Sequence, residues 1–576
     1  MSQPHGSSII SKDNPNQAPT RNPTNVFTDL LFSTFYTVIG YVCLDVVFGI
    51  SLHYIAQHNE PCSVSGLGFA YTIVNVLLIP MAFGTNQSLN VHSAQALGAN
   101  KPKLAQTYFT LTILIHLLYF IPFSAILILI KPIIALTINE KDREATSDAS
   151  QIYLYYLLPS TLFAILYECI KSFMISNKIF AVFMYIQLFT AIIHLFWCEL
   201  FINYLDIGGG IPGAGLAIIC TEVLNFILCI FLIICTRYRR QVFSNYRFKF
   251  SFKRQKNIFK SFLKESFPII AHIYADFFVF FLLTFIAVGF GSDELNAQMA
   301  LSNTSTFYYR FPMSLSLALM TFVGNEMGAR NLQRAKRYSL VGVVLFVGFT
   351  TIFMVGLTFI KEIWCNFYSA GRQEINDIML EVYPIFVFGF FVIDGLQGTL
   401  TGILKGIDRK DFVTYSTLLV YYLIGIPLFL YFACGFGLGL KVYGIWLSFS
   451  LVNALLAILY LILTFTTNWQ QMSERICSRI EKQHAMQNLH DSLNKVIVEN
   501  NIKEKKNKTK RKKAHSQNTK QKQNEEASTQ SNYQKLISNQ IRLRGSDNEG
   551  MQYSLQEAQP SKLQKTIIVE QLTSLS

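Results

Sequence analysis

Long apolar stretches alternate with short polar loops over most of the chain, and this pattern predicts helices that cross a membrane. A helix needs roughly 20 predominantly apolar residues to span the hydrocarbon core of a bilayer. The stretches are too long for the strands of a membrane barrel, and helices satisfy every backbone group in lipid. The chain has about twelve such stretches, at 30–56, 66–92, 108–136, 152–174, 179–204, 213–236, 267–290, 297–322, 338–360, 380–404, 412–436 and 443–466.

The two halves of the chain resemble each other. Residues 94–108 (AQALGANKPKLAQTY) and 324–338 (GNEMGARNLQRAKRY) share a Gly-Ala pair, in which Gly98 and Gly328 are 230 positions apart (328 − 98). A second match, IPGAGLAIICTEVLN against KVYGIWLSFSLVNAL, has nearly the same offset. Two similar hydrophobic halves are typical of secondary transporters, whose substrate site lies between the repeats near the midplane of the bilayer.

The charges of the loops predict the orientation of the helices. Lys and Arg accumulate in cytoplasmic loops. The segment 237–264 is strongly basic and contains no acid, and the two Gly-Ala loops are basic as well. The loops that alternate with them, around 140–148, 293–294 and 374–377, are acidic. We therefore expect both termini to lie in the cytoplasm. The chain itself is expected in the plasma membrane or in the membrane of an acidic organelle.

Composition separates the apolar part of the chain from its ends. Hydrophobic residues make up 51% of the chain although both ends are polar, so the part between them is too apolar for a soluble domain. The chain is accordingly expected to be an all-α membrane protein with two six-helix repeats. The predicted parts are a disordered leader (1–27), an N-terminal lobe (28–236), a basic cytoplasmic linker (237–266), a C-terminal lobe (267–468) and a disordered basic tail (469–576).

The tail contains the run KEKKNKTKRKK at 503–513, which contributes to the net charge of +14. Such a composition buries too little apolar surface to fold, so a solvated tail is expected, and attraction to anionic lipid headgroups is the alternative. Nucleic acid is not an expected partner of a chain held in a membrane.

Several classes of protein lack their signature in this sequence. There is no phosphate-binding loop of the GxxxxGK type and no nucleophile–base arrangement, so neither an enzyme nor an ATP-driven pump is expected. There is no CxxC and no His/Cys ligand spacing, so no metal site and no cofactor are expected. A receptor or channel would not need two matched halves.

Four segments, in order along the chain, resemble motifs of the multidrug and toxic compound extrusion (MATE) family. They are SAQALGANK (93–101), DIGGGIPGAGLAI (206–218), the stretch 294–336 with its VGNEMGA loop, and GTLTGILKGIDRKD (398–411). The resemblance covers about residues 28–468 and implies two six-helix lobes around a central cleft. It implies a monomer that exports organic solutes, organic cations or other xenobiotics above all, against an inward flow of protons or sodium ions.

Four carboxyl groups lie in the middle of predicted helices, where a charge is costly and therefore points to function. Asp45 and Asp276 fall at matching places in the two halves, and Glu168 and Asp394 match approximately. A buried carboxyl can bind a proton or a cation but disfavours binding both together. This competition couples the movement of protons to the opposite movement of a cationic substrate. The resemblance implies acids on helices seven and ten, so Asp276 and Asp394 are the expected main coupling site. Lys171, three residues after Glu168, leaves a structural salt bridge as the alternative there.

Other side chains are candidates for the substrate cleft and for moving parts. An aromatic ring can hold a cation on its face, and a proline can kink a helix. Arg310 could pair with an acid, extend to the interface or favour an anionic substrate. Glu222 is expected to be interfacial or hydrogen-bonded. The predicted cleft residues are Tyr274, Asn303, Phe307, Tyr308, Arg310 and His272, and the predicted gate or hinge residues are Pro80, Pro312, Gly98, Gly328 and Glu326.

Two alternatives to a proton-coupled exporter remain open. A flippase for a lipid-linked precursor has the same broad architecture, but it would favour basic residues in the cleft to hold phosphate. An exporter driven by sodium ions fits the same carboxyl groups.

Overall fold

The computed structural model describes residues 25–57, 61–136, 143–208, 210–236, 242–243, 252–369 and 371–488, together with Ser528 and Ser531. In these ranges the chain is helical and forms no strand. The predicted leader up to residue 24 and the lysine-rich run 503–513 lie outside the described residues. All the helices discussed below belong to one compact unit, Met1–His490.

The first half of this unit supplies one set of helices, here called the N-terminal set. Long apolar runs give long helices, two of which continue through an internal proline, Pro122 or Pro159. Several of them carry Pro in the first turn, where a missing N–H costs nothing. The set comprises α1 (Val26–Gln57), α2 (Pro61–Leu77), α3 (Ile79–Gly98), α4 (Pro102–Ile128), α5 (Lys131–Leu136), α6 (Arg143–Ser176), α7 (Ala181–Cys198), the π-helical turn η1 (Glu199–Tyr204) and α8 (Ile211–Cys235).

The second half supplies the C-terminal set. Two of its spans contain π-helical turns, which widen the helix locally and are frequent at functional sites. The set comprises α10 (Phe252–Val288), α11 (Ser292–Gly328), α12 (Leu332–Phe359), α13 (Lys361–Ser369), α14 (Gln373–Pro384), η2 (Ile385–Phe391), α15 (Val392–Gly406), α16 (Lys410–Leu418), η3 (Leu419–Gly425), α17 (Ile426–Ala433) and α18 (Lys441–Thr466).

The predicted apolar stretches coincide with these helices. Ten single helices are long and apolar enough to cross a membrane, and the bent pair α2–α3 makes eleven. The remaining predicted stretch, 297–322, lies in α11. This helix is more polar because its Gln298, Thr304, Ser305 and Thr321 are buried against neighbouring helices rather than exposed to lipid. The prediction of an all-α membrane protein is confirmed.

The two sets repeat one arrangement. α1 packs on α7 as α10 packs on α16, and α6 packs on α8 as α15 packs on α18. The loops repeat as well, because left-handed backbone occurs at Asn100 and Arg330 and again at Lys178 and Asp408. Both pairs are 230 residues apart (330 − 100 and 408 − 178), the offset found in the sequence. The predicted internal repeat is therefore present in the structure.

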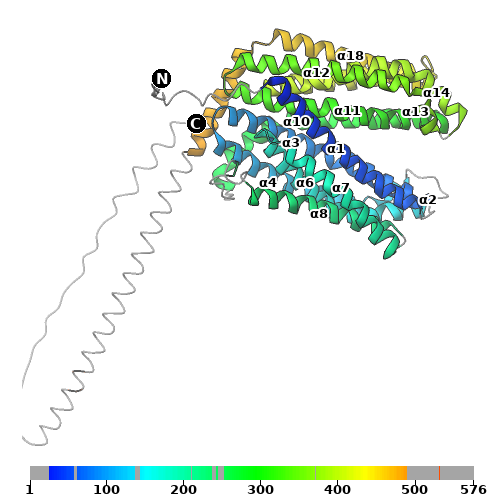
Figure 1. Ribbon diagram of the computed structural model, residues 1–576, viewed down its shortest axis with the longest axis horizontal. Helices are drawn as coiled ribbons and strands as arrows, with labels where there is room; N and C mark the ends of the chain where they lie inside the picture. The colour runs from blue at the N-terminus through cyan, green and yellow to red at the C-terminus, as the bar shows by residue number, and fades with distance from the viewer. Residues whose placement is uncertain are drawn as a thin grey trace, which may run out of the picture. The chain divides into compact units, whose positions relative to one another are not determined.

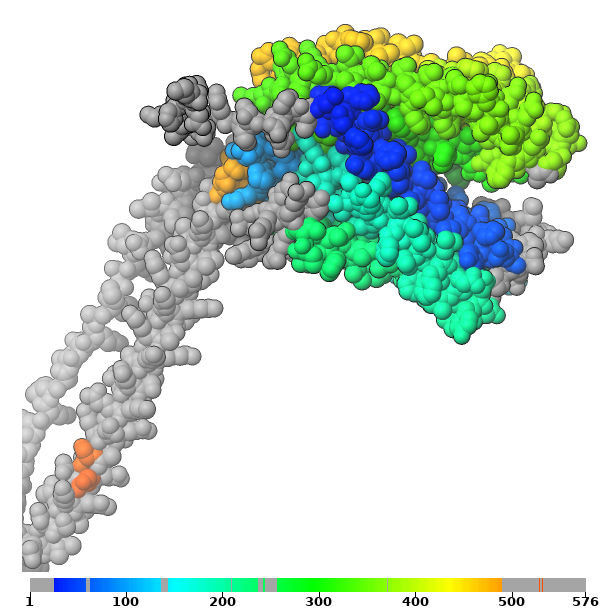
Figure 2. All heavy atoms as spheres, viewed as in Figure 1, coloured from blue at the N-terminus to red at the C-terminus, as the bar shows by residue number. Residues whose placement is uncertain are grey.

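The two sets meet along a few helices. α3 packs against both α10 and α11, and α1 packs against α11 and α12. In Figure 1 the sets diverge toward the end that carries α2 and α13, and Figure 2 shows α1 (blue) along the boundary between them. The other end, here called the Gly-Ala end, contains the loops that follow α3, α11 and α15.

Two predicted boundaries differ from the structure. α10 begins at Phe252, inside the predicted linker 237–266, because Ile258 and Phe262 are buried on the face opposite its lysines. Residues 469–488, predicted to belong to a disordered tail, form a helix. Its apolar positions recur every three or four residues and are buried, which anchors an otherwise polar segment; they are Trp469, Met472, Ile476 and Ile480.

Candidate functional site

A cavity of about 260 Å³ opens among the helices of the N-terminal set and is completed by α10 and α11 of the C-terminal set. Aromatic rings and aliphatic side chains form most of its wall, and a few polar groups converge on it, which is the usual composition of a small-molecule site. The polar and charged lining residues are Tyr41, Asp45, Ser51, Tyr71, Asn75, Asn86, Tyr153, Ser160, Thr161, Tyr167, Glu168, Glu222 and Arg310.

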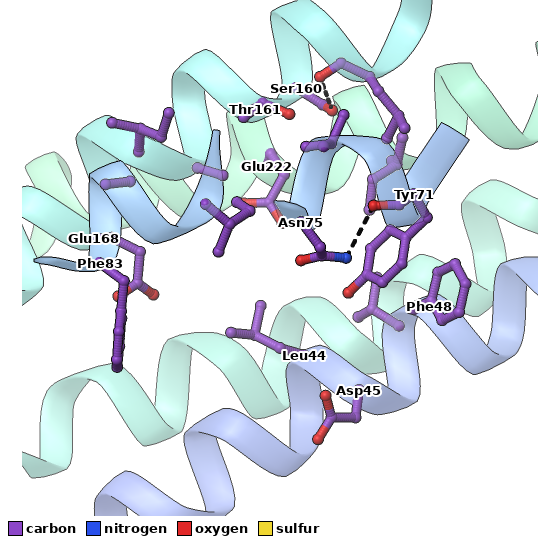
Figure 3. A pocket seen from close by; sticks show the side chains of 18 of the residues that line it. Leu44, Asp45, Phe48, Tyr71, Asn75, Phe83, Ser160, Thr161, Glu168 and Glu222 are labelled. Carbon is purple, nitrogen blue, oxygen red and sulfur yellow. Dashed lines mark hydrogen bonds between the residues drawn. The ribbon is translucent and has the colours of Figure 1, made fainter. Parts of the chain in front are cut away.

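Three carboxyl groups of the cavity come from three different helices. Asp45 lies on α1, Glu168 on α6 and Glu222 on α8. Figure 3 shows Asp45 on one side of the cavity, with Glu222 and Asn75 facing it from the other side. The side chain of Asn75 is oriented by its own helix, because its Nδ2 donates to the carbonyl of Tyr71 at 3.0 Å. The cavity therefore presents carboxyl groups from opposite walls.

Asp45 is paired with Arg310 across the boundary between the two sets. Arg310 Nε donates to Asp45 Oδ2 at 2.8 Å, and Arg310 Nη2 donates to Asp45 Oδ1 at 2.5 Å. This is the two-pronged geometry that a planar guanidinium makes with a carboxylate. Of the three roles considered for Arg310, the structure shows pairing with an acid, and this pair joins α1 to α11.

Glu168 is paired within its own helix. Lys171 Nζ forms a salt bridge with Glu168 Oε1 and also lies 4.5 Å from the centroid of the Tyr41 ring. The salt bridge weighed from the sequence is therefore present, at the wall of the cavity. Glu222 accepts a hydrogen bond from Asn225 Nδ2 at 3.3 Å. This agrees with the expected hydrogen-bonded role, but its place in the lining was not anticipated.

The two acids of the C-terminal set lie outside this cavity, Asp394 buried and Asp276 with 22% of its side chain exposed. Asp394 is 4% exposed and accepts a hydrogen bond from Asn453 Nδ2 at 3.3 Å, while Tyr421 donates to Asn453 Oδ1 at 2.9 Å. The carboxyl groups of Asp276 and Asp394 are close enough to interact electrostatically. One oxygen of each, Oδ1 of Asp276 and Oδ2 of Asp394, has no hydrogen-bond partner among the described residues.

A lysine joins this buried cluster. Lys405 Nζ donates to Gln87 Oε1 of the N-terminal set at 2.9 Å and lies 3.4 Å from His272 Nδ1. His272 Nδ1 is in turn 3.4 Å from Asp276 Oδ2. His272, expected near the cleft because it precedes Asp276 by one helical turn, therefore does contact that acid.

The remaining predicted cleft residues lie outside the cavity. Tyr274 donates to the carbonyl of Leu77 at 2.7 Å and so joins α10 to α2. Tyr308 is buried in the C-terminal set, where its hydroxyl donates to the carbonyl of Phe391 at 2.6 Å. Asn303 and Phe307 are exposed on α11. Of the predicted cleft residues, Arg310 lines the cavity directly.

Of the predicted hinge and gate residues, Pro80 lies beside a break between two helices and Glu326 at a contact between the two sets, whereas Pro312 lies within a single helix. α2 and α3 are bent by 40° at Leu78, next to Pro80. Pro312 is buried inside α11. Glu326 is buried and forms salt bridges with Lys178 of the N-terminal set at 3.6 Å and with Arg334 at 3.8 Å. Glu326 therefore connects the two sets near the Gly-Ala end.

The helix 469–488 closes the Gly-Ala end. Arg479 Nη1 binds Asp408 Oδ1 at 2.9 Å and Glu265 Oε2 at 3.3 Å, and its Nη2 donates to Gln95 Oε1 at 2.5 Å. Burial would raise the pKa of the Asp408 carboxyl, but Arg479 and Lys410 beside it hold that pKa below its usual range. One arginine thus ties the tail helix to both sets.

Other bonds support this closure. Gln95 Nε2 donates to the carbonyl of Gly406 at 3.0 Å, and Asn325 Nδ2 donates to the carbonyl of Ala94 at 3.2 Å. Ser473 Oγ donates to the carbonyl of Met327 at 2.7 Å. The sets are therefore held together from this end toward the middle of the molecule.

Three residues, Glu222, Lys405 and Arg479, were not predicted as site residues from the sequence. Glu222 had no acidic counterpart at the repeat offset, where Asn453 stands instead (453 − 222 = 231). The structure shows that Asn453 hydrogen-bonds Asp394, so the repeat offset relates Glu222 to a partner of that acid. Lys405 and Arg479 gave no local signal, since both are ordinary cytoplasmic charges in the sequence. Among the described residues, no group of three or more His, Cys, Asp or Glu side chains could hold a metal ion.

The amino-acid sequence is similar to a family model and to known proteins. A family model described as MatE matches residues 38–200 and 268–430, one segment in each set of helices. The chain is 23% identical to protein DETOXIFICATION 4 of Arabidopsis thaliana over 433 residues, 74% of this chain and 87% of that protein. It is 23% identical to multidrug and toxin extrusion protein 1 of Oryctolagus cuniculus over 418 residues, 73% of this chain and 71% of that protein.

Solved structures resemble the fold as well. The eukaryotic MATE transporter AtDTX14 matches with a TM-score of 0.69 at 20% identity, over 79% of this chain and 100% of that one. The Vibrio cholerae MATE transporter VcmN in its bent form matches with a TM-score of 0.66 at 14% identity, over 80% of this chain and 98% of that one. At these identities the likeness concerns the fold.

Proposed function

Because the chain belongs to the MatE family of multipass membrane transporters, we propose that it exports positively charged organic solutes in exchange for protons. Members of the family are multidrug and toxin extrusion transporters rather than enzymes, and their coupling to proton or sodium gradients is a property of the family. Beyond the family, we propose the substrate class, the coupling ion and the location, which is the plasma membrane or the membrane of an acidic organelle.

The observation that carries the substrate class is the acid-lined cavity. Asp45, Glu168 and Glu222 enter it from three helices, and the ring of Tyr41 already lies beside cationic side chains. Carboxylates and aromatic faces in a partly dehydrated site favour a positively charged organic group. A solute of modest size fits a volume of about 260 Å³.

Asp276 and Asp394 are the proposed proton-coupling residues, with Asp45 and Glu168 subsidiary. Buried polar atoms in native proteins are normally hydrogen-bonded, so an orphan carboxyl oxygen needs an explanation. If each carboxyl carries a proton it is neutral, so leaving one of its oxygens without a partner no longer means burying an uncompensated charge. The electrostatic interaction of the two acids also makes binding of a proton at one depend on the state of the other.

The transport cycle requires the Gly-Ala end to open and close. With both termini proposed to be cytoplasmic, the arrangement described here is closed on the cytoplasmic side and faces outward. Opening toward the cytoplasm then requires the bonds of Arg479, Glu326 and Lys405 between the two sets to break. The bend beside Pro80 and the interior Pro312 are the proposed points of flexure.

A lipid-linked precursor flippase is the weaker alternative, because phosphate recognition calls for several cations facing the cavity. Among the described residues, Arg310 is the single cationic one in the lining, and it is already paired with Asp45. Sodium coupling is the second alternative, and a sodium ion would need several oxygen ligands around Asp276 or Asp394.

The test is transport by the purified full-length chain in proteoliposomes. Uptake of a labelled quaternary ammonium cation is measured with an imposed pH gradient, and then with a sodium gradient alone. We expect pH-driven uptake that falls to background in Asp276→Asn and Asp394→Asn. Asp377→Asn, which removes an exposed acid from α14, is the matched control. Sodium-driven uptake without a pH gradient, or wild-type uptake by both variants, would overturn the coupling assignment.

A further inference from the structure

The cavity already contains a cation. The guanidinium of Arg310 donates two hydrogen bonds to the carboxylate of Asp45, at 2.8 and 2.5 Å. Its Cζ lies 5.9 Å from the centroid of the Tyr41 ring. The pair is only partly buried, with 23% of the Arg310 side chain and 34% of the Asp45 side chain exposed. Both partners are therefore accessible to a solute that enters the cavity.

The other charges of the lining differ in how they are compensated. Glu168 forms a salt bridge with Lys171, which is itself buried beside Tyr41. Glu222 has a hydrogen bond from Asn225 but forms no salt bridge with a described residue. The cavity thus offers one carboxyl without a salt bridge and one ion pair that can be opened.

A simple cation and a zwitterion meet this arrangement differently. A cation that took Asp45 would leave the guanidinium of Arg310 without its anion in a site of low polarity, which is costly. A solute with both charges avoids that cost, because its carboxylate replaces Asp45 on Arg310 while its cationic group takes Asp45. The fork of donors on Arg310 fits an incoming carboxylate as it fits the carboxylate of Asp45.

We propose that the cavity recognises zwitterionic solutes, whose carboxylate binds Arg310 and whose cationic group binds Asp45 and Glu222. This rests on the proposed function and narrows it: among solutes that carry a cationic group, those that also carry a carboxylate are preferred. Arg310 belongs to α11 and Asp45 to α1. A zwitterion inserted between them replaces a direct bond between the two sets of helices with a bond through the solute.

Arg310 is therefore the residue that selects zwitterions over cations of the same size. Neutralising it removes the site for the solute's carboxylate and frees Asp45 for any cation. The charge-retaining Arg310→Lys keeps a cation in place but loses the two-pronged geometry, so it should keep part of the preference. The Arg310–Asp45 pair therefore selects solutes by the charges they carry rather than by the size of their apolar part.

The experiment uses matched probes that differ in one charge. Trimethylammonium carboxylates with three chain lengths are compared with their methyl esters, which keep the cation and lose the anion. Equilibrium binding to the purified full-length protein and pH-driven uptake in proteoliposomes are both measured. We expect the wild type to bind at least one zwitterion about tenfold more tightly than its ester. Arg310→Gln should remove or invert that preference.

Controls separate this proposal from general loss of charge or folding. Arg372→Gln removes an arginine from an exposed salt bridge with Asp293, far from the lining in sequence, and should leave the preference unchanged. Arg310→Lys and the wild-type comparison remain informative if Arg310→Gln does not fold, which is judged by size-exclusion chromatography.

Failure of this proposal can be told from failure of the proposed function. Equal or tighter binding of the esters by the wild type, an unchanged preference in Arg310→Gln, or no binding of any probe would each overturn recognition of zwitterions. If the esters are taken up under a pH gradient while the zwitterions are ignored, export in exchange for protons stands and this inference fails.

Discussion

Gly98 and Gly328 occupy equivalent positions, and each packs against the backbone of the other's helix. Gly98 lies against the carbonyl of Asn325, and Gly328 lies against the carbonyl of Gln95. A β-carbon at either glycine would collide with that carbonyl. Because Asn325 and Gln95 are also 230 residues apart (325 − 95), the contact has the self-complementary form of a two-fold interface. Closure of the Gly-Ala end therefore depends on glycine at both places.

Gly98→Ala and Gly328→Ala should each prevent this closure. The added methyl group would meet rigid backbone, so α3 and α11 would have to separate rather than adjust a side chain. We expect transport to fall at least about tenfold, which corresponds to roughly 1.4 kcal/mol, and the Gly-Ala end to become more reactive to a thiol reagent at an introduced cysteine.

The matched control is Gly356→Ala on α12, where, beyond the adjoining turns of its own helix, no atom of the described residues lies within 4 Å of the new methyl group. In a helix that change favours folding by about 0.5–1 kcal/mol. Unaltered closure in both interface variants would contradict the prediction.

Arg479 should hold the helix 469–488 in place. Its guanidinium contacts Asp408, Glu265 and Gln95, so Arg479→Ala leaves the buried carboxylate of Asp408 with less compensation. Removing one partner of a buried pair costs about 3–5 kcal/mol. We expect faster amide hydrogen exchange throughout 469–488 and a lower unfolding temperature.

Arg475→Ala on the same helix is the control, because that side chain is half exposed and approaches Asp408 only to 3.8 Å. Equal exchange in the two variants would mean that the apolar face of the helix, rather than Arg479, retains it.

The closure by Arg479 should be insensitive to pH in the neutral range. The pKa of Asp408 lies below its usual value in the folded protein, so its ion pair contributes full stability above the unfolded pKa of about 4. That contribution is lost only as the pH falls below about 4, through the folded pKa. Hydrogen exchange of 469–488, corrected for its intrinsic pH dependence, should therefore be constant between about pH 5 and 8. A loss of protection between pH 7 and 5 would point to a different group.

The sequence predicted the parts of this molecule that depend on local pattern. Apolar runs long enough to cross a bilayer placed the spans, and the offset of 230 predicted a repeat that the backbone shows at Asn100 and Arg330. Intramembrane acids could be recognised because a charge in lipid is costly. The number of apolar helices was less secure, because α11 is polar along a face that its neighbours bury.

Tertiary partners could not be predicted in the same way. Arg310 and Asp45 are 265 residues apart, and nothing near either residue indicates the other. The four apolar positions that anchor the helix 469–488 stand at the start of a polar tail, where the average composition hides them. The cavity formed mainly by α1, α2, α3, α6 and α8 was also unforeseen, because the strongest family-like segments belong to the C-terminal set.

Lys171 and Glu168 should prove strongly coupled in stability. The Lys171 side chain is 7% exposed and that of Glu168 is 24% exposed, so each depends on the other for compensation in a site of low polarity. Lys171→Met alone would leave Glu168 without its cation and should cost about 3 kcal/mol or more. Glu168→Gln/Lys171→Met removes both charges and should recover most of that loss, since the pair is replaced by neutral groups of similar size.

Unfolding of purified protein in detergent, followed by tryptophan fluorescence for the two single variants and the double variant, measures the coupling. The exposed pair Lys131–Asp148 is the comparison, and its double variant should show little coupling. Additive effects at Glu168 and Lys171 would mean that their contact is incidental and that Glu168 is free to serve the coupling role considered for it.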